Sequence, residues 1–222
     1  DQVEDQVEDK EGNKLQVNDI WEVIYTQRAI RYWAEEPIPR ELIEKIIEAA
    51  SKAPSGSNHQ PWMFVVADRD PVKILLADAL RNFYEGGQLR TLVESGQKTE
   101  DSSQRLMMSG AENFFTNLKT APAIIIPCLY KLSSPTSETN TLVAGSSIYL
   151  AVQNMLLAAR SLGLGTLMTT SHSLIEDVIR DVCKIPEDAH PAALIPIGFP
   201  AVKFGPTKRK PVKDIIVWNE WR

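Results

Sequence analysis

Four stretches of the chain repeat apolar residues at the three- and four-residue spacing of a helix with one buried face. These stretches are residues 17–25, 40–53, 70–84 and 141–163. The last has small and apolar residues on most of its sides, which predicts a central, buried helix, and Gly163 stands where a helix C-terminal cap is expected. A shorter helix is expected over residues 111–118.

Four shorter stretches are almost continuously apolar and predict β-strands, at residues 63–67, 123–129, 164–170 and 191–199. The unbroken apolar character of the first suggests burial on both faces. Pro127 lacks an N–H group and therefore indicates an edge strand, a bulge or a strand end. Helices and strands do not alternate regularly, and no G-x-G-x-x-G segment follows a strand. We therefore expect an α+β fold, a small sheet covered by helices, rather than a Rossmann fold.

The chain divides into a tail and one domain. Residues 1–16 are acidic, polar and partly repetitive, which is typical of a flexible tail. Residues 17–222 have the length and apolar content of a single compact domain. Within it, residues 84–110 or thereabouts are polar, contain glycine and are only weakly periodic, so we expect a helical excursion or a mobile lid.

Composition and charge limit the kinds of ligand and the cellular location that we expect for this protein. A net charge of −5 argues against nucleic acid as the main partner, although local basic groups can still hold a small phosphate. The two cysteines and three histidines show no metal-ligand spacing, so no metal site is expected. A disulfide framework is also not expected, which favours a reducing, cytoplasmic location. No apolar run is long enough for a membrane span, and whether a targeting or anchor segment precedes Asp1 is left open.

Two basic clusters are candidate anion sites. Arg28 and Arg31 follow the first predicted helix, and their planar guanidinium groups can converge on one phosphate. On spacing alone, a solvated pair at a helix end explains them better. The cluster Lys208-Arg209-Lys210 would add to such a site, although basic clusters near a terminus are usually solvated surface.

The loop from Pro54 to Pro61 has more polar groups than a simple helix-to-strand connection needs. Its hydroxyls, amide side chain and backbone N–H groups can hold a polar, planar ligand. The alternative is a turn whose serines and asparagine satisfy their own backbone, and for the loop taken alone this is the better explanation.

A serine hydrolase is disfavoured. The chain has no G-x-S-x-G segment, and Ser171 and His172 are sequence neighbours, which point to opposite faces of an extended strand.

Together these segments resemble the nitroreductase superfamily of flavin enzymes, in order and over nearly the whole chain. Residues 27–66, QRAIRYWAEEPIPRELIEKIIEAASKAPSGSNHQPWMFVV, are similar to that family's basic segment, helix and APSGxNxQPW loop. The segments IYLAVQNMLLAARSLGLGTLMTT, LIPIGFPA and KRKPVKDIIV resemble its central helix and strand, its late strand and its C-terminal phosphate-contacting segment.

The resemblance implies a nitroreductase-like fold with a small central mixed β-sheet, an intertwined homodimer, and FMN at the dimer interface. It also implies that NADH or NADPH reduces the flavin, which then passes a hydride or electrons to a small organic acceptor such as a nitroaromatic or a quinone. The residues implied to bind FMN are Arg28, Ala29, Arg31, Pro54, Ser55, Gly56, Ser57, Asn58, Gln153, Leu167, Met168, Thr169, Thr170, Lys208 and Arg209.

Within that set the resemblance gives different roles. Arg28 and Arg31 would bind the phosphate and ribityl groups, and Arg209, helped by Lys208, would close the phosphate site. Ser57 and Asn58 would be the main polar contacts of the loop with the flavin ring. Thr170 lies where some members place a hydrogen bond to flavin N5, which makes it the candidate catalytic contact.

The sequence also departs from the family pattern. Gln27 and Ala29 stand where the family has arginine and serine, and His59 has no assigned role. The segments TAPAIII and KRKP look most like the iodotyrosine deiodinase branch, so reductive dehalogenation of a halotyrosine is an alternative, with Tyr84 as a candidate substrate contact. That branch clamps its substrate with a glutamate four residues before a tyrosine, and none stands four residues before Tyr84. A member that binds or stores flavin without turnover is another alternative, and the flavin-destroying dimethylbenzimidazole synthases are a further branch that no segment of the sequence specifically supports.

Overall fold

The computed structural model describes residues 16–131 and 142–221. Its α-helices are α1 (Ile20–Thr26), α2 (Arg40–Ser51), α3 (Asp70–Glu85), α4 (Gln88–Gly96), α5 (Ser102–Asn117), α6 (Leu142–Ser161) and α7 (Glu176–Cys183). Its strands are β1 (Trp62–Ala67), β2 (Ala123–Tyr130), β3 (Gly165–Thr166), β4 (Ala189–Pro191) and β5 (Ile195–Gly198). Four short 3-10 helices are η1 (Gly56–Asn58), η2 (Leu118–Thr120), η3 (Ser171–Leu174) and η4 (Val212–Asp214). The expected acidic tail lies outside the described residues, apart from Gln16.

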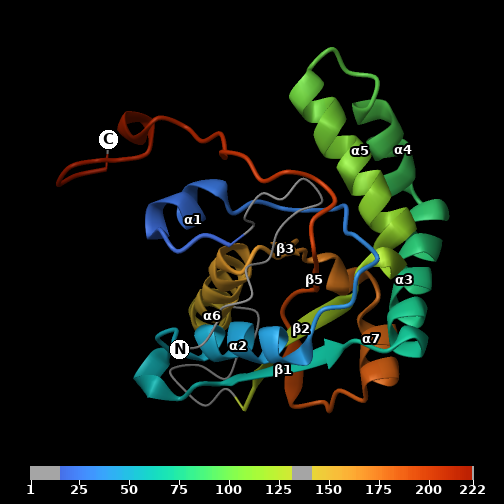
Figure 1. The fold of residues 1–222 in the computed structure, drawn as a ribbon, viewed down its shortest axis with the longest axis horizontal. Helices are drawn as coiled ribbons and strands as arrows, with labels where there is room; N and C mark the ends of the chain where they lie inside the picture. Colours follow the sequence, from blue (N-terminus) through green and yellow to red (C-terminus); the bar gives the residue numbers. More distant parts are fainter. Residues whose placement is uncertain (1–15, 132–141, 222) are drawn as a thin grey trace.

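A five-stranded sheet lies between two layers of helices (Figure 1). The strand order is β1-β2-β5-β3, and β4 pairs with the other end of β2. Helices α2 and α6 pack on one face of the sheet, and α3, α5 and α7 pack on the other. The predicted α+β class is therefore confirmed. In the described part of the chain, no helix is long and apolar enough to cross a membrane.

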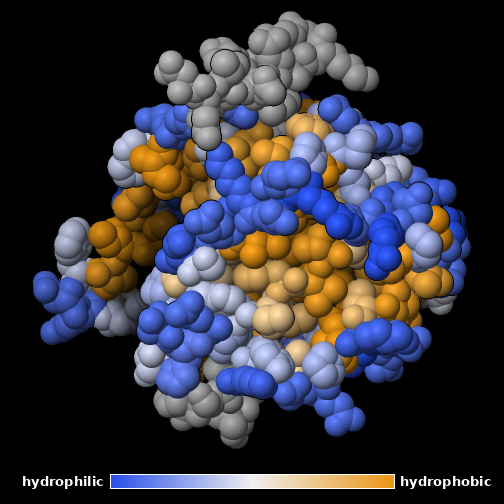
Figure 2. All heavy atoms as spheres, turned by 60° about the horizontal axis from the view of Figure 1, so that its bottom comes forward, coloured by the Kyte–Doolittle hydropathy of each residue, from blue (hydrophilic) through white to orange (hydrophobic). Residues whose placement is uncertain are grey.

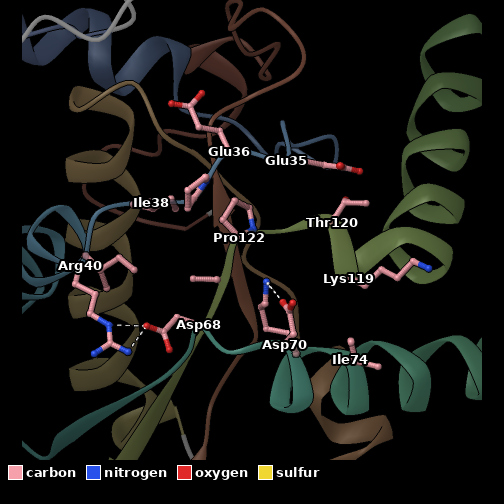
Figure 3. A pocket seen from close by; sticks show the side chains of 14 residues that line it. Glu35, Glu36, Ile38, Arg40, Asp68, Asp70, Ile74, Lys119, Thr120 and Pro122 are labelled. Carbon is pink, nitrogen blue, oxygen red and sulfur yellow. Dashed lines mark hydrogen bonds and ion pairs between the residues drawn. The ribbon is translucent and has the colours of Figure 1, made fainter.

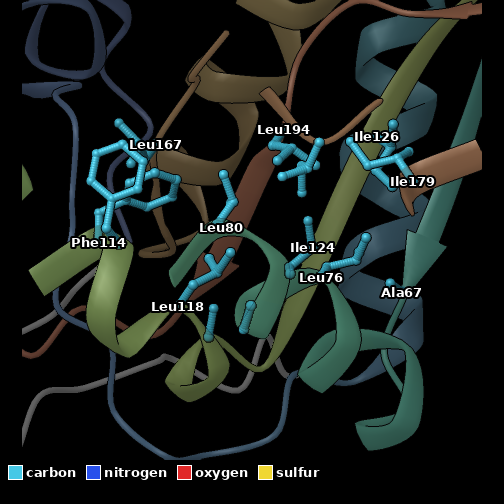
Figure 4. Close-up of a cluster of buried hydrophobic side chains, with 14 of the residues drawn as sticks. Ala67, Leu76, Leu80, Phe114, Leu118, Ile124, Ile126, Leu167, Ile179 and Leu194 are labelled. Atoms are coloured by element: carbon cyan, nitrogen blue, oxygen red, sulfur yellow. The ribbon is translucent and has the colours of Figure 1, made fainter. Parts of the chain in front are cut away.

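Strand β2 supplies the centre of both hydrophobic cores. Its successive side chains alternate between the faces, so Ile124 and Ile126 join the core under α3, α5 and α7, while Ala123 and Ile125 join the core under α2 and α6. Figure 4 shows the first of these cores, in which the two isoleucines lie among side chains from the three helices α3, α5 and α7. Full burial of one such side chain contributes about 1.5–3 kcal/mol.

The strand directions differ from the expected mixed sheet. Every pair among the described strands is antiparallel, and the one parallel pairing is an isolated bridge between Ala29 and Thr166. A parallel pair needs a crossover that returns the chain to the opposite end of the sheet. Here the long helical connection after β1 instead brings the chain back beside Ala67, where β1 ends, so β2 runs in the reverse direction.

Pro127 lies inside the central strand rather than at an edge. The carbonyl of Pro127 accepts a hydrogen bond from the Ala192 N–H (2.8 Å), so its nitrogen faces the same neighbouring chain. That chain is divided here into β4 and β5, because residues 192–194 lie between them. The missing N–H of proline therefore falls opposite a break in the ladder, where no regular strand partner is deprived of a hydrogen bond.

Two other strands are shorter or more exposed than expected. Of the predicted strand 164–170 only Gly165–Thr166 is regular, since the next partner of this strand is Pro196, which accepts from the Leu167 N–H but has no N–H to return. Strand β1 was expected to be buried on both faces, but it is an edge strand, and Met63 is 55% exposed.

The described monomer leaves several apolar faces uncovered (Figure 2). Helix α1 is capped by Asp19, which accepts from the Glu22 N–H (2.8 Å), yet Trp21 is 61% exposed and only Val23 is buried. Helix α6 packs against α2 and the sheet, but its side chains Val143 and Leu150 are 48% and 46% exposed. Every described residue from Lys208 onward is also exposed, and Trp218 is 78% exposed.

The thiol of Cys128 gives the fold a pH dependence. Cys128 is 1% exposed in β2, and burial raises its pKa to about 12. An unfolded thiol ionises near pH 8.5, so between about pH 8.5 and 12 the unfolded chain loses a proton that the folded chain keeps. The free energy of unfolding should therefore fall as pH rises, by at most about 1.4 kcal/mol per pH unit. Urea unfolding near pH 8 and pH 10 should show a larger fall for the natural protein than for Cys128→Ala, and equal falls would contradict this account.

Candidate functional site

Residues 28–33 are held against β3. The Ile30 N–H donates to the Thr166 carbonyl (2.9 Å), and the Trp33 indole N–H donates to the Gly165 carbonyl (3.2 Å). Gly165 is needed here, because a Cβ on it would lie 2.8 Å from the Ile30 side chain. With Ile30 buried at 2% exposure, the flanking Arg28 and Arg31 are left on a fixed, accessible edge.

The two arginines form an unneutralised pair of cations. Arg31 is half-buried, and burial, followed by the positive charge of Arg28, lowers its pKa. Its guanidinium nevertheless stays protonated at any physiological pH. Within residues 16–131 and 142–221, neither arginine forms an ion pair with a carboxylate. Two neighbouring cations, one of them partly desolvated, favour an anion between them.

The start of the C-terminal segment runs beside this pair. The Thr207 N–H donates to the Tyr25 carbonyl (3.0 Å), and the Arg28 Nη1 lies 3.6 Å from the position that a Cβ on Gly205 would take. Lys208 and Arg209 follow directly and are exposed. The structure therefore brings the start of the second basic cluster into the neighbourhood of the first.

Arg160 contacts both the end of α1 and the start of the C-terminal segment. Its Nε donates to the Thr26 hydroxyl (2.8 Å), and its guanidinium lies 4.1 Å from the centre of the Phe204 ring. The Arg160 Nη2 also lies 3.8 Å from a carboxylate oxygen of Glu22. This 5%-exposed side chain thus joins the end of α1, the end of α6 and the start of the C-terminal segment. The sequence prediction missed it, although a lone charge in the last turn of a long apolar helix was the available signal.

The backbone of the loop 54–60 is strained, and only some of its polar groups form hydrogen bonds within the loop. Ser57, Asn58 and Gln60 have φ values of 51°, 55° and 51°, which non-glycine residues rarely adopt. Within the loop, Ser55 Oγ accepts from the Gln60 N–H (2.9 Å) and the Asn58 side-chain oxygen accepts from the Gln60 amide (3.3 Å). His59 Nδ1 lies 3.0 Å from the Gly56 carbonyl oxygen. The Ser57 hydroxyl and the Asn58 NH₂ have no hydrogen-bond partner among the described residues.

One chain does not bring this loop to the arginines. The loop is attached to α6 near its start, because Ser147 Oγ accepts from the Gly56 N–H (3.3 Å). The arginine segment is attached near the other end of the same helix, at Arg160. At 1.5 Å per residue, these two attachment points are about 20 Å apart along α6. Gln153 lies between them and is exposed.

The segment after β3 presents some of its predicted side chains and hides others. Leu167 is buried in the core, so only its backbone is available to a ligand. The Thr169 hydroxyl lies 2.9 Å from the Ser171 hydroxyl and also accepts from the Ser171 N–H (3.1 Å). Met168 and Thr170 are exposed, and the Thr170 hydroxyl has no partner among the described residues.

Tyr84 lies in the core. It is 2% exposed, and its ring stacks on Phe115 with 5.1 Å between the ring centres. Its hydroxyl is buried without a hydrogen-bond partner, and burial, followed by the charge of Glu112, raises its pKa. A side chain in this place does not reach the surface, which argues against the predicted substrate contact.

Two other kinds of site receive no support from the described residues. Ser171 is engaged with Thr169, Ser173 donates to the Thr170 carbonyl (3.0 Å), and the Nδ1 of His172 is buried without a partner, so no Ser/His pair forms. In the same part of the chain, no group of three or more His, Cys, Asp or Glu side chains is arranged to hold a metal.

A charged pocket of about 650 Å³ lies at the far end of β1 from the loop (Figure 3). Two of its cations are paired within the pocket, Arg40 with Asp68 (2.6 Å) and Lys73 with Asp70 (3.2 Å). None of the predicted site residues lines it.

Comparison with known proteins identifies the family. The model of the Nitroreductase family matches residues 24–199. A provisionally named NADH dehydrogenase/NAD(P)H nitroreductase of Methanothermobacter thermautotrophicus is 33% identical over 194 residues, covering 86% of this chain and 83% of that protein. An iodotyrosine deiodinase of Danio rerio is 28% identical over 197 residues, covering 86% of this chain and 64% of its own length.

The fold is also shared with a solved structure. A nitroreductase with bound FMN from Desulfitobacterium hafniense superposes with a TM-score of 0.66 at 22% identity, over 92% of this chain and 100% of that one. Since the family match covers most of the sequence, the chain belongs to the nitroreductase family of flavin-dependent oxidoreductases.

Proposed function

We propose that this protein binds FMN and uses NADH or NADPH to reduce a small organic acceptor such as a nitroaromatic or a quinone. The observation that carries the proposal is the unneutralised pair Arg28 and Arg31 beside β3. A phosphate monoester carries up to two negative charges, and it would neutralise both guanidinium groups with charge-assisted hydrogen bonds. Among the described residues, no carboxylate forms an ion pair with either guanidinium group.

The remaining predicted contacts suit the rest of the cofactor. Lys208 and Arg209 follow a segment fixed to Tyr25, so they can close the phosphate end. The free Ser57 hydroxyl and the Asn58 NH₂ can hydrogen-bond the polar edge of a planar ring. The free Thr170 hydroxyl can hold a proton at its Oγ1 toward a ring nitrogen. When bound, FMN supplies the transfer of a hydride or of electrons, and the chain's own residues orient it and exclude water.

The proposed active form is a homodimer with FMN between the two chains. In one chain, the loop and the arginines are attached to α6 about 20 Å apart, which favours a site in which the loop of one copy meets the arginines of the other. In a two-fold dimer, each surface meets its own equivalent, and two identical composite sites result. The exposed apolar side chains of α1, α6 and the C-terminal segment are what such a dimer would cover.

Reductive dehalogenation of a halotyrosine is the second candidate. It is favoured by the 28%-identical relative named iodotyrosine deiodinase. The burial of Tyr84 removes the one side chain that the sequence offered for holding such a substrate. We therefore rank it below reduction of a nitroaromatic or quinone.

Flavin absorbance tests the proposed function. The purified protein should show a flavin band after incubation with FMN, and NADH or NADPH should bleach the band without oxygen. Adding a nitroaromatic or a quinone should restore it, whereas restoration by a halotyrosine alone would favour the second candidate. A protein that takes up no FMN contradicts the proposal, and one that binds FMN but is not bleached by either nucleotide stores the flavin without turnover.

A further inference from the structure

Helix α5 forms hydrogen bonds and packing contacts with the segment that contains Arg31. The Asn113 amide donates to the Arg31 carbonyl (2.6 Å), and the Tyr32 hydroxyl donates to the Ser109 carbonyl (3.4 Å). Between these contacts stands Gly110, where a Cβ would lie 3.1 Å from Arg31 Cδ. Three residues on one side of α5 therefore contact two consecutive residues of the predicted phosphate segment.

Gly110 is unusual for its place in a helix. Glycine in a helix interior is less favourable than alanine, so its presence there generally reflects a packing requirement. Here the requirement is visible, because Gly110 is buried and the stem of Arg31 occupies the space where a side chain would be. The same stem carries the half-buried guanidinium, so the width of this gap limits where that charge can lie.

We propose that α5 positions Arg31 for the cofactor, with Gly110 setting the room for its side chain and Asn113 fixing its backbone. This inference rests on the proposed function. Gly110 and Asn113 are positioning residues, since they act on the ligand only through Arg31. Figure 1 shows α4 and the first half of α5 projecting from the rest of the molecule. Residues 101–107 in this part of the helical excursion are all exposed. A shift of that excursion would therefore move Arg31, and FMN binding would in turn favour the docked position of α5.

A double-mutant cycle tests the proposal. The FMN dissociation constant is measured by flavin fluorescence for the natural protein, Gly110→Leu, Arg31→Ala and the double variant. Gly110→Leu should raise the constant about tenfold in the natural background and by less than about twofold when Arg31 is already alanine, because contacting residues couple. Equal effects in both backgrounds, or no effect in either, would overturn the proposal.

Ser103 provides the matched control. It is exposed on the same helix, so Ser103→Leu adds the same side chain to α5 away from Arg31 and should leave FMN affinity within about twofold. Circular dichroism checks that each variant is folded, and Gly110→Ala with the same cycle replaces Gly110→Leu if the larger side chain prevents folding. If the natural protein itself binds no FMN, the proposed function fails; if it binds FMN and the cycle shows no coupling, only the positioning role fails.

Discussion

Replacement of Arg28 and Arg31 together by alanine is expected to weaken FMN binding about a thousandfold. Each charge-assisted contact contributes roughly 1.5–3 kcal/mol, and loss of two contacts multiplies the effects. The two guanidinium groups lie on an edge fixed by the Ile30 hydrogen bond to β3. Their loss should leave the sheet and its core intact. The measurement is an FMN titration followed by flavin fluorescence.

Two exposed arginines elsewhere serve as the control. Arg69 and Arg90 lie at the starts of α3 and α4, outside the candidate site, and Arg69→Ala with Arg90→Ala changes the net charge by the same amount. That double variant should bind FMN within about threefold of the natural protein, since exposed charges far from a site are screened by salt. Equal weakening in both double variants would mean that overall charge, rather than an arginine site, governs binding.

Local patterns predicted much of the fold. Helices α2 and α3 occupy nearly the residues that the apolar spacing indicates, and Gly163 has a φ of 78°, as its place after a helix suggests. Such features depend on residues close in sequence, so one sequence suffices to find them. The strand pairings depend instead on residues far apart in sequence. The break opposite Pro127 depends on where residues 192–194 lie, and the shortness of β3 depends on its pairing with Pro196.

The sequence likewise indicated only those residues of the candidate site that belong to recognisable local segments. Arg28, Ser57 and Thr170 belong to recognisable segments, and each is accessible in the structure. Arg160 and Gly110 were missed because their contacts join segments far apart in sequence. Tyr84 was a candidate substrate contact, but its side chain is buried in the core. Periodicity identified the apolar side of α1, but it could not indicate that the chain itself leaves this side uncovered.

The second large effect concerns the two ends of α6. If each FMN site combines the arginines of one chain with the loop of the other, damage to either end should weaken binding at both sites of a homodimer. Ser57→Glu is the loop variant, because it adds bulk and a negative charge beside the free Asn58 NH₂ while keeping a non-glycine residue at a φ of 51°. We expect it to weaken FMN binding by at least about tenfold, the size of one lost polar contact plus repulsion.

Mixed dimers separate a shared site from a site within one chain. A chain with Arg28→Ala and Arg31→Ala keeps its loop, and a chain with Ser57→Glu keeps its arginines. In a shared arrangement, one of the two sites combines the intact loop with the intact arginines. In an arrangement within one chain, neither site is intact. The two variants carry different affinity tags, so that only the mixed species is purified.

The FMN stoichiometry of this tagged, mixed species tests most directly whether each FMN site is shared between two chains. The shared-site account predicts that about one FMN binds per mixed dimer with nearly natural affinity, while each homodimer binds FMN weakly. A mixed dimer that binds FMN as weakly as the two homodimers, or a natural protein that binds FMN fully as a monomer in sedimentation experiments, would contradict it.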